Sequence, residues 1–265
     1  MKVAAIVSAL ALASSAVAAP GKVGKKLPTT KIANIEVVDT PLVRDAIKEV
    51  KKFIPLQPYL YNHVMRSWLF GAAAFNNNAT LKASIDLEAH AVGTLLHDLG
   101  WDMRPDSPWV TKEHRFEVDG GVGAMNFINS HPCAKKEWDE TRIGWVYDAI
   151  ALQAISDIPD FKSIQTQWII KSVGFEFPGP RSPLIKDEDY DSILGEYPND
   201  TLFRGTNATF TWLAASKPDA VYNTFIQDFG TAFVSGFNAT GHRLFDVIQG
   251  GLQAEVAANP GSSFP

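Results

Sequence analysis

A histidine and an aspartate stand side by side at the end of an apolar stretch of the chain. His97 and Asp98 directly follow Leu95 and Leu96 in the sequence TLLHDLGWD. Placing two ionisable groups at the edge of an apolar helix costs free energy unless something pairs with both. Imidazole nitrogens and carboxylate oxygens are ligands for borderline divalent ions such as zinc or iron. Taken alone, the pair admits two interpretations: a hydrogen-bonded core histidine, which such dipeptides often contain, and a metal site.

The elements that position these side chains are expected to be helices. Apolar residues at helical spacing predict helices over residues 41–53, 59–75, 81–99, 113–130, 136–155, 161–173, 217–237 and 241–258. Neighbouring side chains on a helix diverge by about 100°, so His97 and Asp98 can share an ion only near a helix end, where Gly100 is a suitable stop. We find no hairpin signal and no domain linker. The predicted fold class is all-α, with one domain over residues 39–258.

The first residues have the features of a secretory signal peptide. Lys2 is followed by an apolar run and then by small residues up to Ala19, and residues 1–19 match the order of such a signal. Residues 20–38 are basic and are expected to form an extended N-terminal arm. Asn-x-Thr sequons, which accept N-glycans in secreted proteins, begin at Asn78, Asn199, Asn207 and Asn238. We therefore predict a secreted, extracellular glycoprotein.

The composition excludes several functional classes. Cys133 is the single cysteine of the 265 residues, so no intramolecular disulfide can form, and the 46% hydrophobic content must supply the stability. The formal net charge is −5 and there is no basic block, so no nucleic-acid partner is expected. No apolar run after the first residues reaches the length of a membrane span, so no membrane partner is expected. The sequence does not indicate an oligomeric state.

Four segments follow one another in an informative order: HVMRSW (63–68), LLHDLG (95–100), HRFEVDGG (114–121) and DAIALQAISDI (148–158). Together they resemble the HD-domain superfamily, and within it the cyanamide hydratase-like branch, over roughly residues 40–180. The resemblance implies an HD-type helical domain with one or two divalent metal ions. It places the first three metal ligands at His63, His97 and Asp98. We expect zinc, with iron or manganese as alternatives.

The resemblance also identifies two departures from the pattern of the branch. The fourth ligand of the superfamily is an aspartate, but the matching stretch SVGFEFPGP (172–180) offers Glu176; Asp157 and Asp160 are rivals by residue type only. The branch has a pocket histidine where AIALQAI has Gln153. A glutamine amide donates and accepts hydrogen bonds but cannot shuttle a proton near neutral pH. If the usual histidine is an acid or base, its role is lost or has moved, and His114 is a candidate.

Several other residues in the motifs have two possible roles. Arg66, one turn from His63, could hold a substrate or pair with a carboxylate. Glu117 could orient a ligand histidine or pair structurally with Arg115, and Asp119 reads as a polar core residue. His114 is expected at the surface or, less readily, in the pocket. Sharing a face with His97, His90 is expected to be a buried histidine with a hydrogen-bond partner.

These expectations define three hypotheses for function. The first is a metal-dependent hydratase or hydrolase of a small molecule, which for a nitrile such as cyanamide would add water and give urea. In it the ion activates water, and Asp98 or Glu117 relays the proton. The second is an HD-type phosphohydrolase, which would use Arg66 and Arg115 to hold phosphate. The third is a secreted binding protein that has kept the fold without the chemistry.

Overall fold

The computed structural model describes residues 27–177 and 180–260, so the predicted signal peptide and the start of the predicted arm lie outside the described residues. The described residues are mostly helical, which confirms the all-α expectation. The longer helices are α1 (Pro41–Val50), α2 (Pro58–Asn76), α3 (Ala79–Ser84), α4 (Leu87–Leu96), α5 (Phe116–Ser130), α6 (Ala134–Glu137), α7 (Glu140–Leu152), α8 (Ile164–Gly174), α9 (Asp187–Glu196), α10 (Leu202–Ser216), α11 (Ile226–Phe233) and α12 (Leu244–Ala258). Short 3-10 turns lie at η1 (Lys51–Phe53), η2 (Leu99–Trp101), η3 (Ile158–Phe161) and η4 (Pro218–Ala220).

A two-stranded hairpin replaces the second half of the predicted arm. Strands β1 (Thr29–Ile32) and β2 (Ile35–Val38) pair antiparallel, and β2 packs on α2. Ala33 and Asn34 form the turn with φ of 48° and 60°, as a two-residue type I′ turn requires. The prediction that no hairpin is present was wrong. Ala-Asn lacks the glycine of the usual Asn-Gly signal, and Asn34 supplies the left-handed conformation instead.

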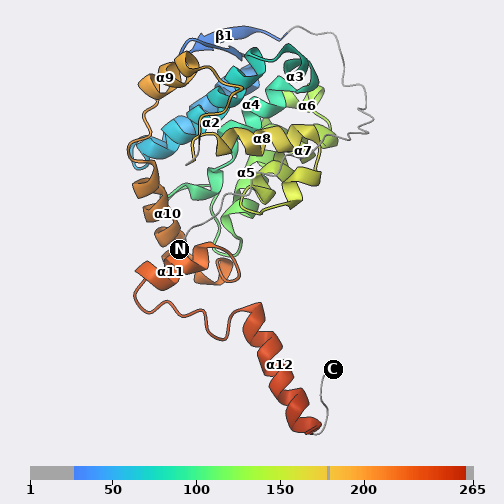
Figure 1. The fold of residues 1–265 in the computed structure, drawn as a ribbon, viewed down its shortest axis with the longest axis vertical. Helices are drawn as coiled ribbons and strands as arrows, with labels where there is room; N and C mark the ends of the chain where they lie inside the picture. The colour runs from blue at the N-terminus through green and yellow to red at the C-terminus, as the bar shows by residue number, and fades with distance from the viewer. Residues whose placement is uncertain (1–26, 178–179, 261–265) are drawn as a thin grey trace.

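Helix α2 lies at the centre of the fold, with α4 and α8 packed against it (Figure 1). Its residues are buried on all sides from His63 to Phe75, as expected for a helix that is apolar around its whole circumference. The three helices approach closely at Gly71. A Cβ there would lie 2.3 Å from Ser172 Oγ and 2.4 Å from His90 Nε2, so no larger residue fits without a shift. This packing holds His63 rigidly within the core.

The predicted helix over residues 81–99 is divided into α3 and α4. Ile85 is extended, and the Asp86 carboxylate accepts a hydrogen bond from Ala89 N–H at 3.0 Å, which caps the new helix. Helix α4 then ends at Leu96, before the His97–Asp98 pair. The polar pair therefore directly follows the last residue of α4.

The C-terminal part of the fold differs most from the expectation. Residues 187–196 and 202–216 form α9 and α10, which the helical pattern did not predict, and the predicted helix at 217–237 reduces to α11. Helix α10 packs on α2 and α11. Helix α12 extends away from the body of the molecule (Figure 1), and none of its residues is buried. None of the helices in the described ranges has the length and apolar content needed to cross a bilayer.

Candidate metal centre

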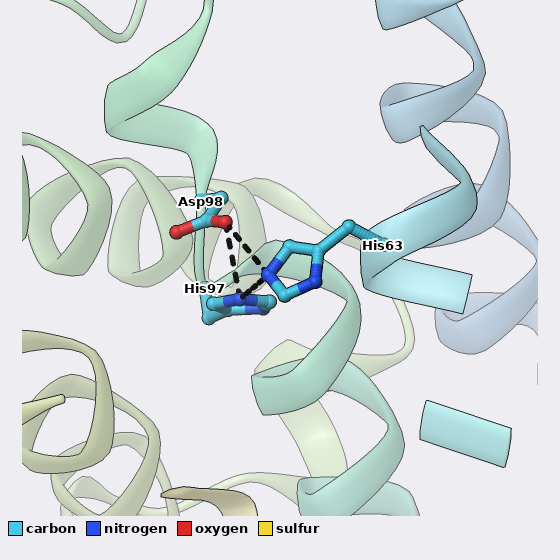
Figure 2. A group of neighbouring side chains, drawn as sticks. All are labelled: His63, His97 and Asp98. Atoms are coloured by element: carbon cyan, nitrogen blue, oxygen red, sulfur yellow. Dashed lines mark hydrogen bonds and ion pairs between the residues drawn. The ribbon is translucent and has the colours of Figure 1, made fainter. Parts of the chain in front are cut away.

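Three buried side chains from two parts of the chain converge on one point. His63 comes from the middle of α2, and His97 and Asp98 follow the end of α4 (Figure 2). The two Nε2 atoms lie 3.0 Å apart, and Asp98 Oδ2 lies 3.2 Å from that of His63 and 3.1 Å from that of His97. Each side chain is at most 1% exposed. The structure thus brings together three of the four predicted ligands.

The backbone at the end of α4 explains how two adjacent residues share one site. His97 keeps helical torsions, whereas Asp98 has φ −108° and ψ 26°, which turns the chain out of the helix. His97 Nδ1 lies 2.8 Å from the carbonyl oxygen of Thr94 and donates to it. In a neutral imidazole this leaves the lone pair on Nε2. The lone pair of His97 therefore points to the side where His63 and Asp98 lie.

Glu176 binds Nδ1, the ring nitrogen of His63 that does not face the cluster. Its Oε1 accepts the hydrogen bond of His63 Nδ1, and its Oε2 accepts one from Arg66 Nε. Arg66 also donates through Nη1 to the carbonyl oxygens of Tyr197 and Pro198, at 3.1 and 2.7 Å. Glu176 therefore lies on the Nδ1 side of His63, apart from the group of three formed by His63, His97 and Asp98, and its role as a fourth ligand stays a prediction. Arg66 is buried and pairs with a carboxylate, in keeping with the second of its two predicted roles.

Burial and mutual charge set the protonation of the cluster. Burial is the main cause that lowers the pKa of His63 to about 4. Burial opposes charge on His97 too, but the adjacent Asp98 outweighs it, so the pKa of His97 is raised. Burial by itself would raise the pKa of Asp98, but the two histidines outweigh it and lower that pKa to about 2. Asp98 is thus a carboxylate, and His63 is neutral and offers a lone pair.

Two aromatic side chains that were not predicted to take part enclose His63. The indole of Trp101 stacks on its ring with centroids 6.0 Å apart and planes 14° apart, and Phe177 meets it edge-on at 6.2 Å. Trp101 follows Gly100, where a Cβ would lie 2.1 Å from the carbonyl oxygen of Phe116. Gly100 is therefore required for the close approach of η2 to α5, rather than as a helix stop. The spacing of Trp101, four residues after His97, was the available signal.

The remaining predicted catalytic residues lie near the site or outside it. Gln153 is the residue directly after α7, and its Nε2 donates to the carbonyl oxygen of His97 at 3.1 Å. It therefore supports the backbone of the cluster. Both oxygens of Glu117 accept from the guanidinium of Arg115, which agrees with the structural reading. Asp119 forms a buried ion pair with Lys217 Nζ at 2.6 Å.

Two further histidines are accounted for by their surroundings. His90 is buried, its Nε2 lies 2.8 Å from Ser172 Oγ, and burial lowers its pKa to about 3. The expectation of a core histidine with a hydrogen-bond partner thus agrees with the geometry. The side chain of His114 is 57% exposed and its Nδ1 lies 3.2 Å from Thr111 Oγ1. This exposure agrees with the expected surface position of His114.

The donor set fits a divalent ion. Two donors at about 2.1 Å from an ion, separated by 90–109°, lie about 3.0–3.4 Å apart, and the three observed separations are 3.0–3.2 Å. Neither oxygen of the buried Asp98 meets a hydrogen-bond donor in acceptable geometry. A buried carboxylate without a partner is rare and costly. A divalent ion between the two Nε2 atoms and the Asp98 carboxylate would satisfy all three groups, so His63, His97 and Asp98 would hold the ion.

No protein-family model matches the chain, and no curated protein matches it. The resemblance to the HD-domain superfamily therefore stays a prediction from the four segments.

Proposed function

We propose that the chain is a secreted, metal-dependent hydratase or hydrolase of a small molecule, with an HD-type domain similar to the cyanamide hydratase-like branch. The observation that carries the proposal is the convergence of His63, His97 and Asp98 in a buried space, with Asp98 left without a hydrogen-bond donor. The order of the LLHDLG and RFEVDG segments supports the same branch.

The number of donors favours catalysis over a structural role. Structural zinc sites close four protein ligands around the ion, whereas catalytic sites use three and keep one position open. When bound, a divalent ion lowers the pKa of water towards neutrality and polarises an electrophilic carbon. Two imidazoles and a carboxylate suit zinc, and they also suit iron or manganese.

The protein residues have distinct roles in water addition. Glu176 and Thr94 fix the ring nitrogens of His63 and His97 that face the cluster. Asp98 Oδ1, the oxygen farther from the imidazoles, would hold the proton that water loses and return it to the substrate nitrogen. For a nitrile, the water oxygen bonds to carbon and both protons end on nitrogen. The product is an amide, or urea when the substrate is cyanamide.

The arginines argue against the phosphohydrolase alternative. A phosphate site needs cationic groups free to meet the phosphate oxygens. Arg66 pairs with Glu176 through Nε and with two carbonyl oxygens through Nη1, which leaves only Nη2 without a partner, and Arg115 pairs with both oxygens of Glu117. Because the indole of Trp101 and the ring of Phe177 also enclose His63, a small uncharged substrate suits the site better.

An assay of the purified chain tests the proposal. The protein would be loaded with zinc, iron or manganese in separate samples and given cyanamide, a small nitrile or a nitrophenyl phosphoester. We expect urea or amide as product, no phosphoester turnover, loss of activity in His97→Ala and retention in His114→Ala. Turnover of the phosphoester alone would favour the phosphohydrolase. A fully loaded protein that turns over neither would favour the binding protein.

The proposal of secretion draws support from the sequons. Asn199, Asn207 and Asn238 are exposed, and Asn78 is half-buried. The Oδ1 atom of Asn78 accepts from Leu81 N–H at 3.0 Å, which leaves its nitrogen for a glycan. A mass shift on enzymatic deglycosylation of protein recovered from the culture medium tests both secretion and glycosylation, and unmodified protein kept in the cells contradicts them.

A further inference from the structure

Helix α12 has a well-defined start but no packing partner among the described residues. The Asp246 carboxylate accepts hydrogen bonds from the backbone N–H and the guanidinium of Arg243, which fixes the first turn. Leu244 N–H donates to Asn223 Oδ1 at 2.8 Å and ties that turn to the body. Beyond it the helix projects freely (Figure 1). An isolated helix of this length is marginal in water without tertiary packing.

The large apolar side chains of α12 are left in solvent. The six that are 45–65% exposed are Leu244, Phe245, Val247, Ile248, Leu252 and Val256. Side chains of this size at such exposure present on the order of 100 Å² each, or about 600 Å² in all, which approaches the ~800 Å² that each partner contributes to a standard interface. Five of the six, all except Val247, lie within about 120° of one another around the helix, and an exposed apolar surface of this kind marks an interaction site.

Two glycines, Gly250 and Gly251, stand at the middle of α12. Gly251 lies three residues after Ile248 and seven after Leu244, and therefore on the apolar face. A glycine within a helix costs about 1 kcal/mol relative to alanine, and a Cβ at either glycine would meet only open space within its own chain. In an antiparallel pair centred on Gly251, the backbones of the two helices can approach closely where the two copies of this glycine meet.

The charges on α12 favour the same arrangement. Glu255 lies three residues after Leu252 and seven after Ile248, and therefore on the apolar face. In a parallel pair, the two copies of Glu255 would meet and repel. In an antiparallel pair, each lies beside the partner's helix N-terminus, whose dipole is positive. Residues 244–258 contain Asp246 and Glu255 but no lysine or arginine, so an anionic lipid surface is a poor alternative occupant.

We propose that α12 binds α12 of a second copy of this chain, antiparallel and about a two-fold axis near Gly250 and Gly251, so that the protein is a dimer. Sedimentation velocity of the full secreted chain over a wide concentration range tests this. We expect a concentration-dependent species of twice the chain mass, which Ile248→Asp abolishes. Gln253→Asp, which places the same charge on the opposite face of α12, should leave the dimer unchanged.

A crosslinking experiment removes the ambiguity that Ile248→Asp unfolds α12. Leu244→Cys and Ala258→Cys are made separately, each with Cys133→Ser, and the two proteins are mixed and oxidised. The antiparallel pair predicts disulfides between the two variants and few within either one. A monomer at every concentration, a dimer that Ile248→Asp leaves intact, disulfides within one variant only, or monomers that bind anionic vesicles would each overturn the proposal.

Discussion

The carboxylate of Glu176 binds the nitrogen of His63 that faces away from His97 and Asp98. One imidazole therefore joins a buried ion pair on one side to a set of metal-type donors on the other. A carboxylate in this position fixes the tautomer and orientation of a ligand histidine and increases its basicity. Arg66 holds the second oxygen of Glu176, so a pair of residues outside the cluster determines how His63 presents its lone pair.

Substitution of Glu176 should weaken metal binding without abolishing it. Glu176→Ala removes the partner of His63 Nδ1, and the loss of such a partner typically costs about 10–100-fold in metal affinity. Glu176→Gln keeps an acceptor oxygen for Nδ1–H and should recover part of that loss. Competition titration with a fluorescent chelator measures both affinities. If both variants lose the ion entirely while remaining folded, Glu176 is a ligand.

Substitution of His97 removes one of the three donors and leaves the charge of Asp98 in place. We expect the loss of this donor to abolish metal binding. We expect about one divalent ion per chain in the wild-type protein and almost none in His97→Ala. Elemental analysis of protein purified without chelator gives both values, with His114→Ala as the matched control at an exposed histidine. Equal metal content in His97→Ala and the wild-type protein would refute the assignment.

The buried pair of Asp119 and Lys217 should contribute to stability and not to metal binding. Lys217→Met leaves the Asp119 carboxylate buried and without its cation, and such a loss typically costs about 3–5 kcal/mol in the free energy of unfolding. Asp119→Asn together with Lys217→Met removes both charges and should recover part of the loss. Urea denaturation measures the change. A metal content that falls along with stability in folded Lys217→Met would place the pair in the site.

His90 should make the protein sensitive to mild acid. Its pKa is about 3 in the folded chain, against 6.5 for the free side chain. Below pH 6.5, His90 is therefore protonated in the unfolded chain but stays neutral in the folded chain. Its contribution to stability is complete above pH 6.5 and declines as the pH falls towards 3, by about 1.4 kcal/mol per pH unit. Urea denaturation of the metal-free protein should show a loss between pH 6.5 and 5 that is about 2 kcal/mol smaller in His90→Gln. An identical loss in both proteins would contradict this assignment.

The sequence predicted the centre of the fold better than its edges. Helical spacing identified α2 and α5 because long buried helices repeat their apolar residues regularly. It missed the hairpin, whose Ala33–Asn34 turn has no glycine, and it missed the break at Asp86, where a single capping side chain outweighs an apolar pattern that continues through it.

The candidate site shows the same division. The motifs identified His63, His97 and Asp98, which the structure brings together. A residue within a helix and two residues at a helix end have few possible side-chain positions, so the local sequence is enough to place them. The motifs could not place Glu176. Which of the two ring nitrogens of His63 the carboxylate contacts depends on how the chain after α8 packs on α2. That contact joins residues 113 positions apart. The support that Gln153 gives to the His97 carbonyl oxygen is tertiary in the same way.

The near-complete burial of the cluster also has a kinetic consequence. His63, His97 and Asp98 are at most 1% exposed, so an ion held by all three would exchange with solvent, as a substrate would enter, only through a local opening of the protein. Its release would wait for the protein to open, and excess chelator would raise the release rate only to a plateau set by that opening. The chain would then acquire its ion most readily while folding, and the metal available in the compartment where it folds would decide which ion the mature protein carries.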